Sequence, residues 1–330
     1  MIISKTPYRI TFFGGGTDYP SWYKFHGGQV INATIDKYIY ITCRYLPPFF
    51  DHTIRLTYSK QEYTSDLKKI SHPSFREVLK FYNINKNIDI HYDGDLPSKS
   101  GIGSSSAFTV GLINALSHFR NIKVSKKKLA NNALHIEQKM IKENVGSQDQ
   151  IAAAYGGINH IKFSKNLDYK VVRIDMTNET LMNLNSRLML FHTGVFRKAD
   201  LVSKKYINKL GSKSKYLNEM SSMVKDAKNL LKNNKLDDFG KLLNESWHLK
   251  KSISSNISNS FIDSIYDTAI KSGAIGGKLL GAGSGGIMMF YVPLKYQSKT
   301  KIALKKLLNI PFNFENYGSQ IIYTSNKKNE

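Results

Sequence analysis

Residues 95–107 read DLPSKSGIGSSSA, in which a proline and a group of small residues lead directly into an apolar run. Glycine lets the backbone approach a ligand closely, and serine can cap a helix and supply a hydroxyl donor. The free N–H groups and the dipole at a helix N-terminus favour an anion. An ordinary helix cap needs one serine, whereas here Ser104, Ser105 and Ser106 follow one another. The stretch therefore predicts a phosphate-binding turn, over residues 101–107, at the start of a helix.

Two other motifs do not fit this stretch. A Walker A loop requires Gly-Lys-Ser/Thr at a fixed spacing, and the sequence has none here. A nucleophile elbow at Ser105 would need a strand that runs directly into the turn. Residues 95–100 intervene and contain a proline, so the phosphate-binding interpretation is retained.

Length and composition indicate a two-domain protein with a reduced cysteine. The chain has 330 residues, of which 41% are hydrophobic, enough for a sizeable core. Cys43 is the single cysteine, so no internal disulfide can form. The sequence contains no apolar run of the roughly 18 residues that span a bilayer, and its first residues lack the pattern of a signal peptide. We expect a cytoplasmic protein with no membrane partner.

The formal net charge is +23. One interpretation is a nucleic-acid or membrane binder. The other is a compositional bias, because the lysines are scattered and no arginine run with interleaved aromatic residues occurs. We favour the second interpretation and expect no nucleic-acid partner, although a positive field would still attract an anionic substrate.

The hydrophobic pattern changes along the chain from strands to helices and back. In the first half, strands are predicted over 2–13, 29–46 (as paired strands), 54–58 and 88–92, and helices over 75–82, 108–119 and 127–143. The second half predicts short apolar runs at 171–174 and 188–192, helices over about 199–251, 261–271 and 299–308, and strands at 278–280, 287–292 and 320–324. A domain boundary is predicted within residues 175–185.

Two further places are rich in glycine. Residues 281–286 read GAGSGG and formally match Gly-x-Gly-x-x-Gly, but the following IMMFYV predicts a strand rather than the helix of a dinucleotide fingerprint. A loop between two strands fits better. The other place is residues 14–16, which precede Thr17 and Asp18. Each place could also be an ordinary tight turn.

Two acidic residues are candidates for phosphoryl-transfer chemistry, which needs metal ligands and a positioned base. Asp149 lies between a helix end and a run of small residues, where it could accept a hydroxyl proton or cap the next helix. Glu137 lies at the edge of an apolar helical stripe, and no cation stands three or four residues away to pair with it. It could bind Mg²⁺, which usually takes only one or two protein ligands, or pair with a cation elsewhere in the fold.

Three stretches in order resemble the motifs of the GHMP kinase family of small-molecule kinases. They are TPYRITFFGGGTDYP at 6–20, LPSKSGIGSSSAF at 96–108 and KLLGAGSGGIMMF at 278–290. The second is the most specific, because the family usually has Pro-x-x-x-Gly-Leu-Gly-Ser-Ser-Ala. This sequence has Ile102 in place of leucine and an additional Ser106 before the alanine, which leaves open which hydroxyl meets the metal.

The resemblance implies two α+β domains, the first similar to ribosomal protein S5 domain 2 and the second ferredoxin-like, with ATP in the cleft between them. On this basis we expect an N-terminal ATP-binding domain over residues 1–180 and a C-terminal domain over 181–330. The stretches FGGGTDYP, VGSQDQIAAAYGG at 145–157 and FHTGVFRKA at 191–199 resemble those of kinases that act on D-glycero-D-manno-heptose 7-phosphate.

The implied reaction transfers phosphate from ATP to the anomeric hydroxyl and gives heptose 1,7-bisphosphate, which feeds nucleotide-activated heptose for surface polysaccharide. Two alternatives remain at this point. One is a kinase of an unphosphorylated sugar such as fucose, and the other is a non-catalytic module that binds RNA or a sugar. A homodimer is left open.

The resemblance also implies roles for individual residues. Asp149 would orient or deprotonate the hydroxyl, and Arg9 would stabilise charge at the attacking oxygen. Ser105 and Glu137 would hold Mg²⁺. The ATP phosphates would lie against Gly101, Gly103, Ser104, Ser105 and Ser106. The substrate would meet Gly16, Thr17 and Asp18, the 7-phosphate would meet Arg197, and the second domain would close the site with Gly281, Gly283 and Ser284.

Overall fold

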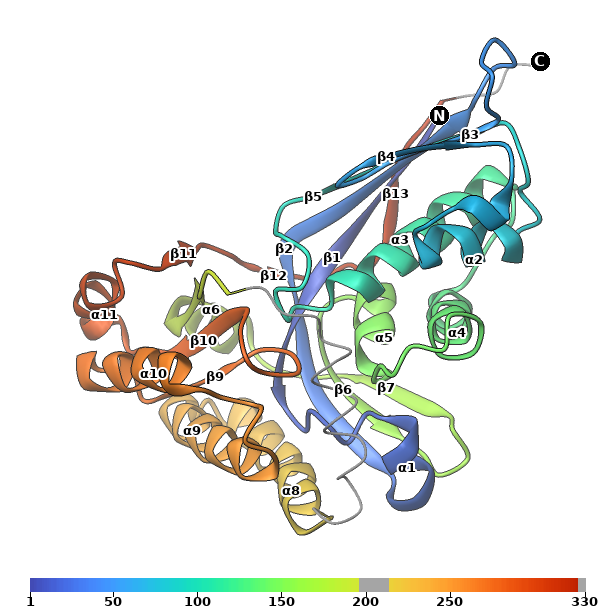
Figure 1. Cartoon of the computed structure of the whole chain (residues 1–330). Helices are drawn as coiled ribbons and strands as arrows, with labels where there is room; N and C mark the ends of the chain where they lie inside the picture. The colour runs from blue at the N-terminus through green and yellow to red at the C-terminus, as the bar shows by residue number, and fades with distance from the viewer. Residues whose placement is uncertain (196–213, 326–330) are drawn as a thin grey trace.

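The computed structural model describes residues 1–195 and 214–325, which form two β-sheets and the helices that cover them (Figure 1). In this part of the chain the first sheet has nine strands, in the order β13-β1-β2-β5-β3-β4, with β6 and β12 also paired to β2 and β7 paired to β6. Its strands are β1 (Ile2–Phe13), β2 (Gly28–Tyr45), β3 (Ile54–Thr57), β4 (Gln61–Thr64), β5 (Ile88–Gly94), β6 (Ile158–Phe163), β7 (Tyr169–Arg173), β12 (Phe314–Glu315) and β13 (Gln320–Thr324).

Strand β2 is the long central strand of this sheet. The prediction of paired strands over residues 29–46 is wrong, because β2 is one continuous strand of 18 residues. No glycine or proline interrupts residues 29–45, and the register shift near Asp36 bends the pairing with β1 without ending the strand. β2 pairs with β1 along most of its length, while β6 pairs with its first half and β5 with its second half. β1 thus lies between β13 and β2, and Arg9, beyond the part of β1 that pairs with β13, has Thr34 of β2 as its strand partner.

One face of the first sheet is covered by helices (Figure 1). These elements are α1 (Pro20–His26), a 3₁₀ turn (Leu67–Lys69), α2 (Pro73–Phe81), α3 (Ser104–Phe119), α4 (Lys126–His135), a π-helical turn (Ile136–Met140) and α5 (Gln148–Tyr155). Helix α3 packs on β1 and β2, and α2, α4 and α5 pack on α3. It is buried almost continuously from Ser106 to Ser117, as expected for a central helix that is apolar on most sides. The N-terminus of α3 is therefore fixed against the sheet.

The single helix predicted over residues 127–143 is wrong in its second half. Helix α4 ends at His135, and the chain continues as the π-helical turn Ile136–Met140. In this turn the Ile141 N–H donates to the Ile136 carbonyl at 2.8 Å, five residues back. Such wide turns are rare and often occur at functional sites. Here the turn carries Glu137, whose side chain is fully buried.

The second sheet is antiparallel and has the order β11-β8-β10-β9. Its strands are β8 (Leu188–His192), β9 (Gly276–Leu279), β10 (Ile287–Tyr291) and β11 (Leu308–Ile310). The other helices are α6 (Asn178–Arg187), α8 (Ser214–Lys232), α9 (Leu236–Ile253), α10 (Ser260–Ser272) and α11 (Gln297–Ala303), with a 3₁₀ turn at Leu294–Tyr296. Helix α9 packs on β9, and α8 packs on α9 and on β1 and β2 of the first sheet. The helix predicted over 299–308 is too long, because α11 ends at Ala303 and Leu308 already begins β11.

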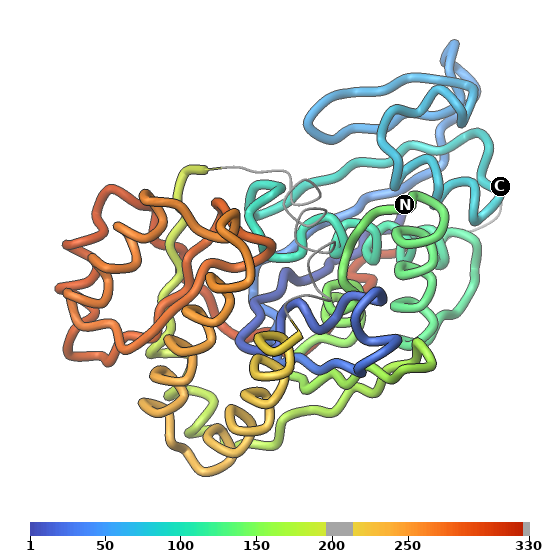
Figure 2. The backbone as a smooth tube through the Cα atoms, turned by 60° about the horizontal axis from the view of Figure 1, so that its bottom comes forward, coloured from blue at the N-terminus to red at the C-terminus, as the bar shows by residue number. Residues whose placement is uncertain are grey.

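The end of the described chain returns to the first sheet. β12 pairs with β2 and β13 pairs with β1, so residues 314–324 lie among the N-terminal strands (Figure 2). The expected α+β class is confirmed, since helices cover two largely antiparallel sheets. The division at residues 180 and 181 stays a prediction. Among the helices of residues 1–195 and 214–325, none is both long and apolar enough to cross a membrane.

Candidate active site

Arg9 and Asp149 form a bidentate ion pair between β1 and α5. Arg9 Nε and Nη2 each lie 2.7 Å from one carboxylate oxygen of Asp149. The Arg9 side chain is buried and that of Asp149 is 22% exposed. Asp149 is the second residue of α5 and Ser147 holds the N-cap position, so Asp149 does not cap the helix. Its carboxylate reaches solvent while its charge is balanced from behind by Arg9.

The predicted phosphate-binding turn lies directly against this pair. The backbone N–H of Arg9 donates to the Ile102 carbonyl at 3.1 Å, and Nη1 donates to the Gly101 carbonyl at 2.8 Å. A Cβ atom at Gly103 would lie 3.2 Å from Oδ2 of Asp149, and Gly103 has a φ of +74°, which favours glycine. The glycines thus bring the turn close to both charged side chains.

The alternative of an ordinary serine cap for α3 does not hold. Gly103 holds the N-cap position, and no side chain caps the helix there. The first N–H groups of a helix have no partner within the helix, so the amides of Ser104, Ser105 and Ser106 are left for a ligand. This is the arrangement that binds anions at a helix N-terminus.

Glu137 and Ser106 meet beneath the turn. The Ser106 hydroxyl donates to Oε2 of Glu137 at 2.8 Å, and Gln150 Nε2 donates to the same oxygen. Oε1 is buried and, among the described residues, has no hydrogen-bond partner. Burial raises the pKa of Glu137 to about 7. Ser105 is exposed, so the structure brings Ser106 rather than Ser105 to Glu137.

The donor set at Glu137 fits a magnesium ion. A carboxylate oxygen without a partner and an adjacent hydroxyl are oxygen ligands of the kind that Mg²⁺ prefers. A nearby divalent cation would also favour the charged form of a carboxylate whose burial opposes ionisation. Within residues 1–195 and 214–325, no group of three or more His, Cys, Asp and Glu side chains forms a metal cage. A metal here would therefore draw further ligands from a bound phosphate.

Asp18 is buried in the loop that follows β1. Its Oδ1 accepts from the Gly16 N–H at 2.9 Å, and its carbonyl accepts from the Ser147 N–H at 2.8 Å, which ties the loop to α5. Burial, and next the negative charge of Asp149, raise the pKa of Asp18 to about 6. The Thr17 hydroxyl lies within hydrogen-bond distance of the Gly14 carbonyl of its own loop and the Gln29 carbonyl of β2, and it accepts from the Gln29 N–H, so its hydrogen bonds are made within the protein.

The third glycine-rich stretch is a loop between two antiparallel strands, β9 and β10, as predicted. A Cβ atom at Gly281 would lie 2.6 Å from the Cα of Gly101, so the two glycine-rich loops touch through their backbones. The Ile287 N–H also donates to the Ser100 carbonyl at 3.1 Å. Gly283 packs against Ile257, and the Ser284 hydroxyl donates to the Asn256 carbonyl. Gly281 therefore faces the phosphate-binding turn, while Gly283 and Ser284 anchor the loop to its own side.

Sequence reasoning missed two buried lysines beside the site. Lys250 of α9 donates to the Gly281 carbonyl at 2.6 Å, and Lys278 of β9 donates to the Phe12 carbonyl at 2.8 Å. Lys250 occupies a position in a stripe of buried residues spaced three or four apart, which includes Leu243 and Trp247. A lysine at such an apolar position is the signal that could have identified it.

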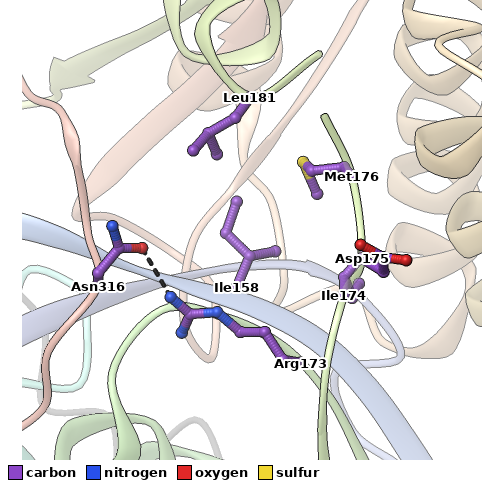
Figure 3. Close-up of a pocket in the computed structure, with 7 residues that line it drawn as sticks. All are labelled: Ile158, Arg173, Ile174, Asp175, Met176, Leu181 and Asn316. Carbon is purple, nitrogen blue, oxygen red and sulfur yellow. Dashed lines mark hydrogen bonds between the residues drawn. The ribbon is translucent and has the colours of Figure 1, made fainter. Parts of the chain in front are cut away.

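Arg197 lies outside the described residues. A pocket on the sheet side of α6 is separate from the residues predicted for the site (Figure 3). It is lined in part by Arg173, Leu181 and Asn316, and Arg173 Nη2 donates to Asn316 Oδ1 at 2.6 Å. Arg173 therefore joins β7 to the returning C-terminal segment.

Comparison with known proteins agrees with this arrangement. Residues 70–157 match the GHMP kinases N terminal domain, and residues 227–308 match the GHMP kinases C terminal domain. A curated D-glycero-alpha-D-manno-heptose 7-phosphate kinase of Campylobacter jejuni subsp. jejuni is 33% identical over 318 residues, which cover 92% of this chain and 93% of that protein.

Two solved structures share the fold. One is a D-glycero-D-manno-heptose 1-phosphate kinase from Bacteroides thetaiotaomicron, with a TM-score of 0.79 and 25% identity, which covers 99% of this chain and 100% of its own. The other is the Lactococcus lactis galactokinase, with a TM-score of 0.75 and 20% identity, which covers 97% of this chain and 94% of its own. The second similarity extends to the fold alone.

Proposed function

Because this chain belongs to the GHMP kinase family, whose sugar kinases are ATP-dependent phosphotransferases, we propose that it phosphorylates the anomeric hydroxyl of D-glycero-D-manno-heptose 7-phosphate. The products would be heptose 1,7-bisphosphate and ADP, for nucleotide-activated heptose and surface polysaccharide. The substrate is supported by the identity with the Campylobacter kinase of that name, which extends over nearly the whole of both chains.

ATP would bind with its phosphates against the N-terminus of α3. The uncapped amides of the first turn and the close backbone of Gly101 and Gly103 support this placement. Gly281 would close over the phosphates, since it already touches Gly101. Neither Ser104 nor Ser105 is fully buried, since the first is half-buried and the second is exposed.

Asp149 would orient the attacking hydroxyl. Both of its oxygens accept from Arg9, and each keeps a second lone pair that can accept the sugar O–H. In this position Asp149 would orient the sugar hydroxyl or accept its proton. Arg9 would hold this geometry and stabilise the negative charge that develops on the attacking oxygen. This pair at the foot of the glycine-rich turn is the observation that carries the proposal.

Glu137 and Ser106 would hold the magnesium ion. Bound there, Mg²⁺ would neutralise charge on the β- and γ-phosphates of ATP. The chain's own contribution is to bury Glu137 in the π-helical turn and to fix Oε2 through Ser106 and Gln150, which leaves Oε1 for the ion.

Asp18 would accept hydroxyls of the sugar, and the Gly16 N–H would keep its carboxylate in place. Asp149 is close enough for its charge to raise the pKa of Asp18, so a sugar could contact both. Arg197 remains our prediction for the residue that binds the 7-phosphate of the sugar.

The test is ADP release with Mg·ATP and a panel of acceptors: the heptose 7-phosphate, the heptose 1-phosphate, hexose and pentose phosphates, fucose and galactose. We expect turnover with the 7-phosphate and a product that carries two phosphate resonances by ³¹P NMR. Preference for the 1-phosphate, as in the name of the Bacteroides kinase, or for a free sugar would contradict the substrate. Retention of RNA that weakens with salt, without ADP release from any acceptor, would favour a binding module.

A further inference from the structure

We propose that Lys250 is a positioning residue for phosphoryl transfer, because its ammonium group holds the Gly281 carbonyl and thereby sets the third glycine-rich loop against the phosphate-binding turn. The inference rests on the proposed function only in taking this site to be the kinase site. It assigns to α9 a residue that none of the three glycine-rich stretches contains.

The Lys250 side chain is buried, and its ammonium group contacts the third glycine-rich loop. The residue is 9% exposed, and its Nζ lies 2.6 Å from the Gly281 carbonyl oxygen and 3.3 Å from that of Leu279. The Trp247 ring lies beside it, with its centroid 6.0 Å from Nζ. Burial of an ammonium group costs free energy. If Lys250 served only to fill space, an apolar residue of similar volume could take its place without loss of stability. The burial therefore indicates a role for the charge or the donors.

Arg9 and Lys250 each donate a hydrogen bond to a backbone carbonyl of one of the two glycine-rich loops. Arg9 Nη1 holds the Gly101 carbonyl at 2.8 Å, and Lys250 Nζ holds the Gly281 carbonyl at 2.6 Å. The two glycines touch each other, since a Cβ atom at Gly281 would lie 2.6 Å from the Cα of Gly101. A cation thus fixes each of two facing backbone segments, one from each sheet.

Holding a carbonyl also orients the neighbouring amide. A trans peptide unit is planar, and its C=O and N–H point in opposite directions. With the Gly281 carbonyl held by Lys250, the Ala282 N–H points away from Lys250. Loss of the lysine would free this peptide to rotate, because Gly281, which has a φ of +74°, carries no Cβ atom that restricts the rotation. The loop would then lose its fixed position against Gly101.

The charged groups that face Lys250 belong to the candidate active site or lie beside it. The groups that face it are Arg9 of β1, Asp18 of the following loop and Lys278 of β9. Burial, and next the positive charge of Arg9, lower the pKa of Lys250 to about 8, while Asp18 opposes the shift. Lys250 therefore loses its positive charge in mildly alkaline solution. Lys278 is equally buried but donates to Phe12 instead of the loop, which makes it a matched control.

The experiment compares K250M with K278M and K251M in the full-length chain, with the acceptor that the wild type uses best. Lys251 pairs with Asp263 at 3.0 Å on the outer side of α9, so K251M should keep its turnover. We expect K250M to lose about 100-fold in kcat, the size of effect that a misplaced reactive group produces. The wild type and K278M should lose kcat/KM above about pH 8, and this alkaline loss should be absent from K250M.

A kcat of K250M within threefold of wild type, or an unchanged alkaline loss, would overturn the proposal. If K250M does not fold, K250A assayed with and without propylamine replaces it: recovery of kcat with the amine supports the proposal, and no recovery by a folded K250A contradicts it. If the wild type uses no acceptor, the proposed function has failed, and the affinity for a fluorescent ATP analogue decides instead. Weaker binding by K250M but not by K278M would support the inference, and equal affinity would refute it.

Discussion

The Ser106 hydroxyl donates a 2.8 Å hydrogen bond to Oε2 of Glu137. The first residue belongs to the start of α3 and the second to a π-helical turn 31 residues later. The bond therefore couples the phosphate-binding turn to the carboxylate that would hold the metal. It also identifies Ser106, among the three consecutive serines, as the one whose hydroxyl contacts Glu137.

Replacement of this hydroxyl should weaken the use of magnesium. In S106A, Glu137 loses the partner that orients its carboxylate, and loss of such a partner typically costs 10–100-fold in metal affinity. We expect the Mg²⁺ concentration for half-maximal activity to rise by about that factor, as measured at saturating ATP. The matched control is S105A, since Ser105 is exposed. A larger effect in S105A than in S106A would assign the metal to Ser105.

Glu137 should make the ligand-free protein less stable as the pH rises. Its folded pKa of about 7 lies above its ordinary value of 4.5, so between these values the folded chain keeps a proton that the unfolded chain releases. The stability that this group contributes is thus present below pH 4.5 and lost as the pH rises to 7. Because E137Q cannot ionise, its free energy of unfolding should rise relative to wild type by about 3 kcal/mol over this range.

The measurement for E137Q is urea unfolding at several pH values without ATP or metal. The difference between the two curves removes the contribution of Asp18 and of every other group that titrates equally in both proteins. Parallel curves would show that Glu137 has an ordinary pKa. The same substitution should abolish most activity, so the variant would be more stable near pH 8 and a poorer enzyme.

D149N should lose catalysis while it keeps the nucleotide site. The amide preserves one acceptor oxygen for Arg9 but cannot hold the sugar hydroxyl with the same charge. Turnover should fall by about 10²–10⁴-fold, and ATP affinity should change little, because the amides of α3 are untouched. Steady-state kinetics and nucleotide titration check the two parts. Turnover close to that of wild type would remove Asp149 from its role.

G101A should damage both stability and activity. The φ of Gly101 is +79°, and an added Cβ would lie 2.5 Å from the Leu280 carbonyl oxygen. The backbone strain alone costs about 1–3 kcal/mol, and the clash should push apart the two glycine-rich loops. Thermal unfolding and the KM for ATP give the readout. The control is G15A, where an added Cβ meets nothing within 4 Å; equal loss in both variants would count against the close contact of the loops.

The elements with strong patterns were predictable from the sequence. Helix α3 and the strands β1 and β13 lie where periodicity and turn residues place them. The π-helical turn was not predictable, because one additional residue per turn leaves the apolar spacing of residues 127–143 nearly unchanged. The alternating pattern of residues 29–46 was interpreted as paired strands, because alternation shows that a segment is extended but not where a strand ends, and the continuous strand is seen in its pairing with β1.

The candidate site was predictable where its residues stand in glycine-rich stretches. The pairing of Arg9 with Asp149 joins residues 140 positions apart, and no local pattern encodes such a contact. The roles of Thr17 and Ser106 depend on where each hydroxyl points, which the letters alone do not give. Lys250 remained hidden because composition places it among many scattered lysines, although its position in a buried stripe distinguishes it.

The return of β12 and β13 to the first sheet has a consequence for biosynthesis. β1 is among the first segments to leave the ribosome, but its outer partner β13 is translated some 320 residues later, and β12 adds to the middle of β2 only shortly before that. During synthesis the N-terminal sheet therefore has an unpaired edge until α8, α9 and the second sheet have been translated. Contacts that are so distant in sequence slow folding, so nascent chains stalled before residue 314 should be the species that most need protection from aggregation.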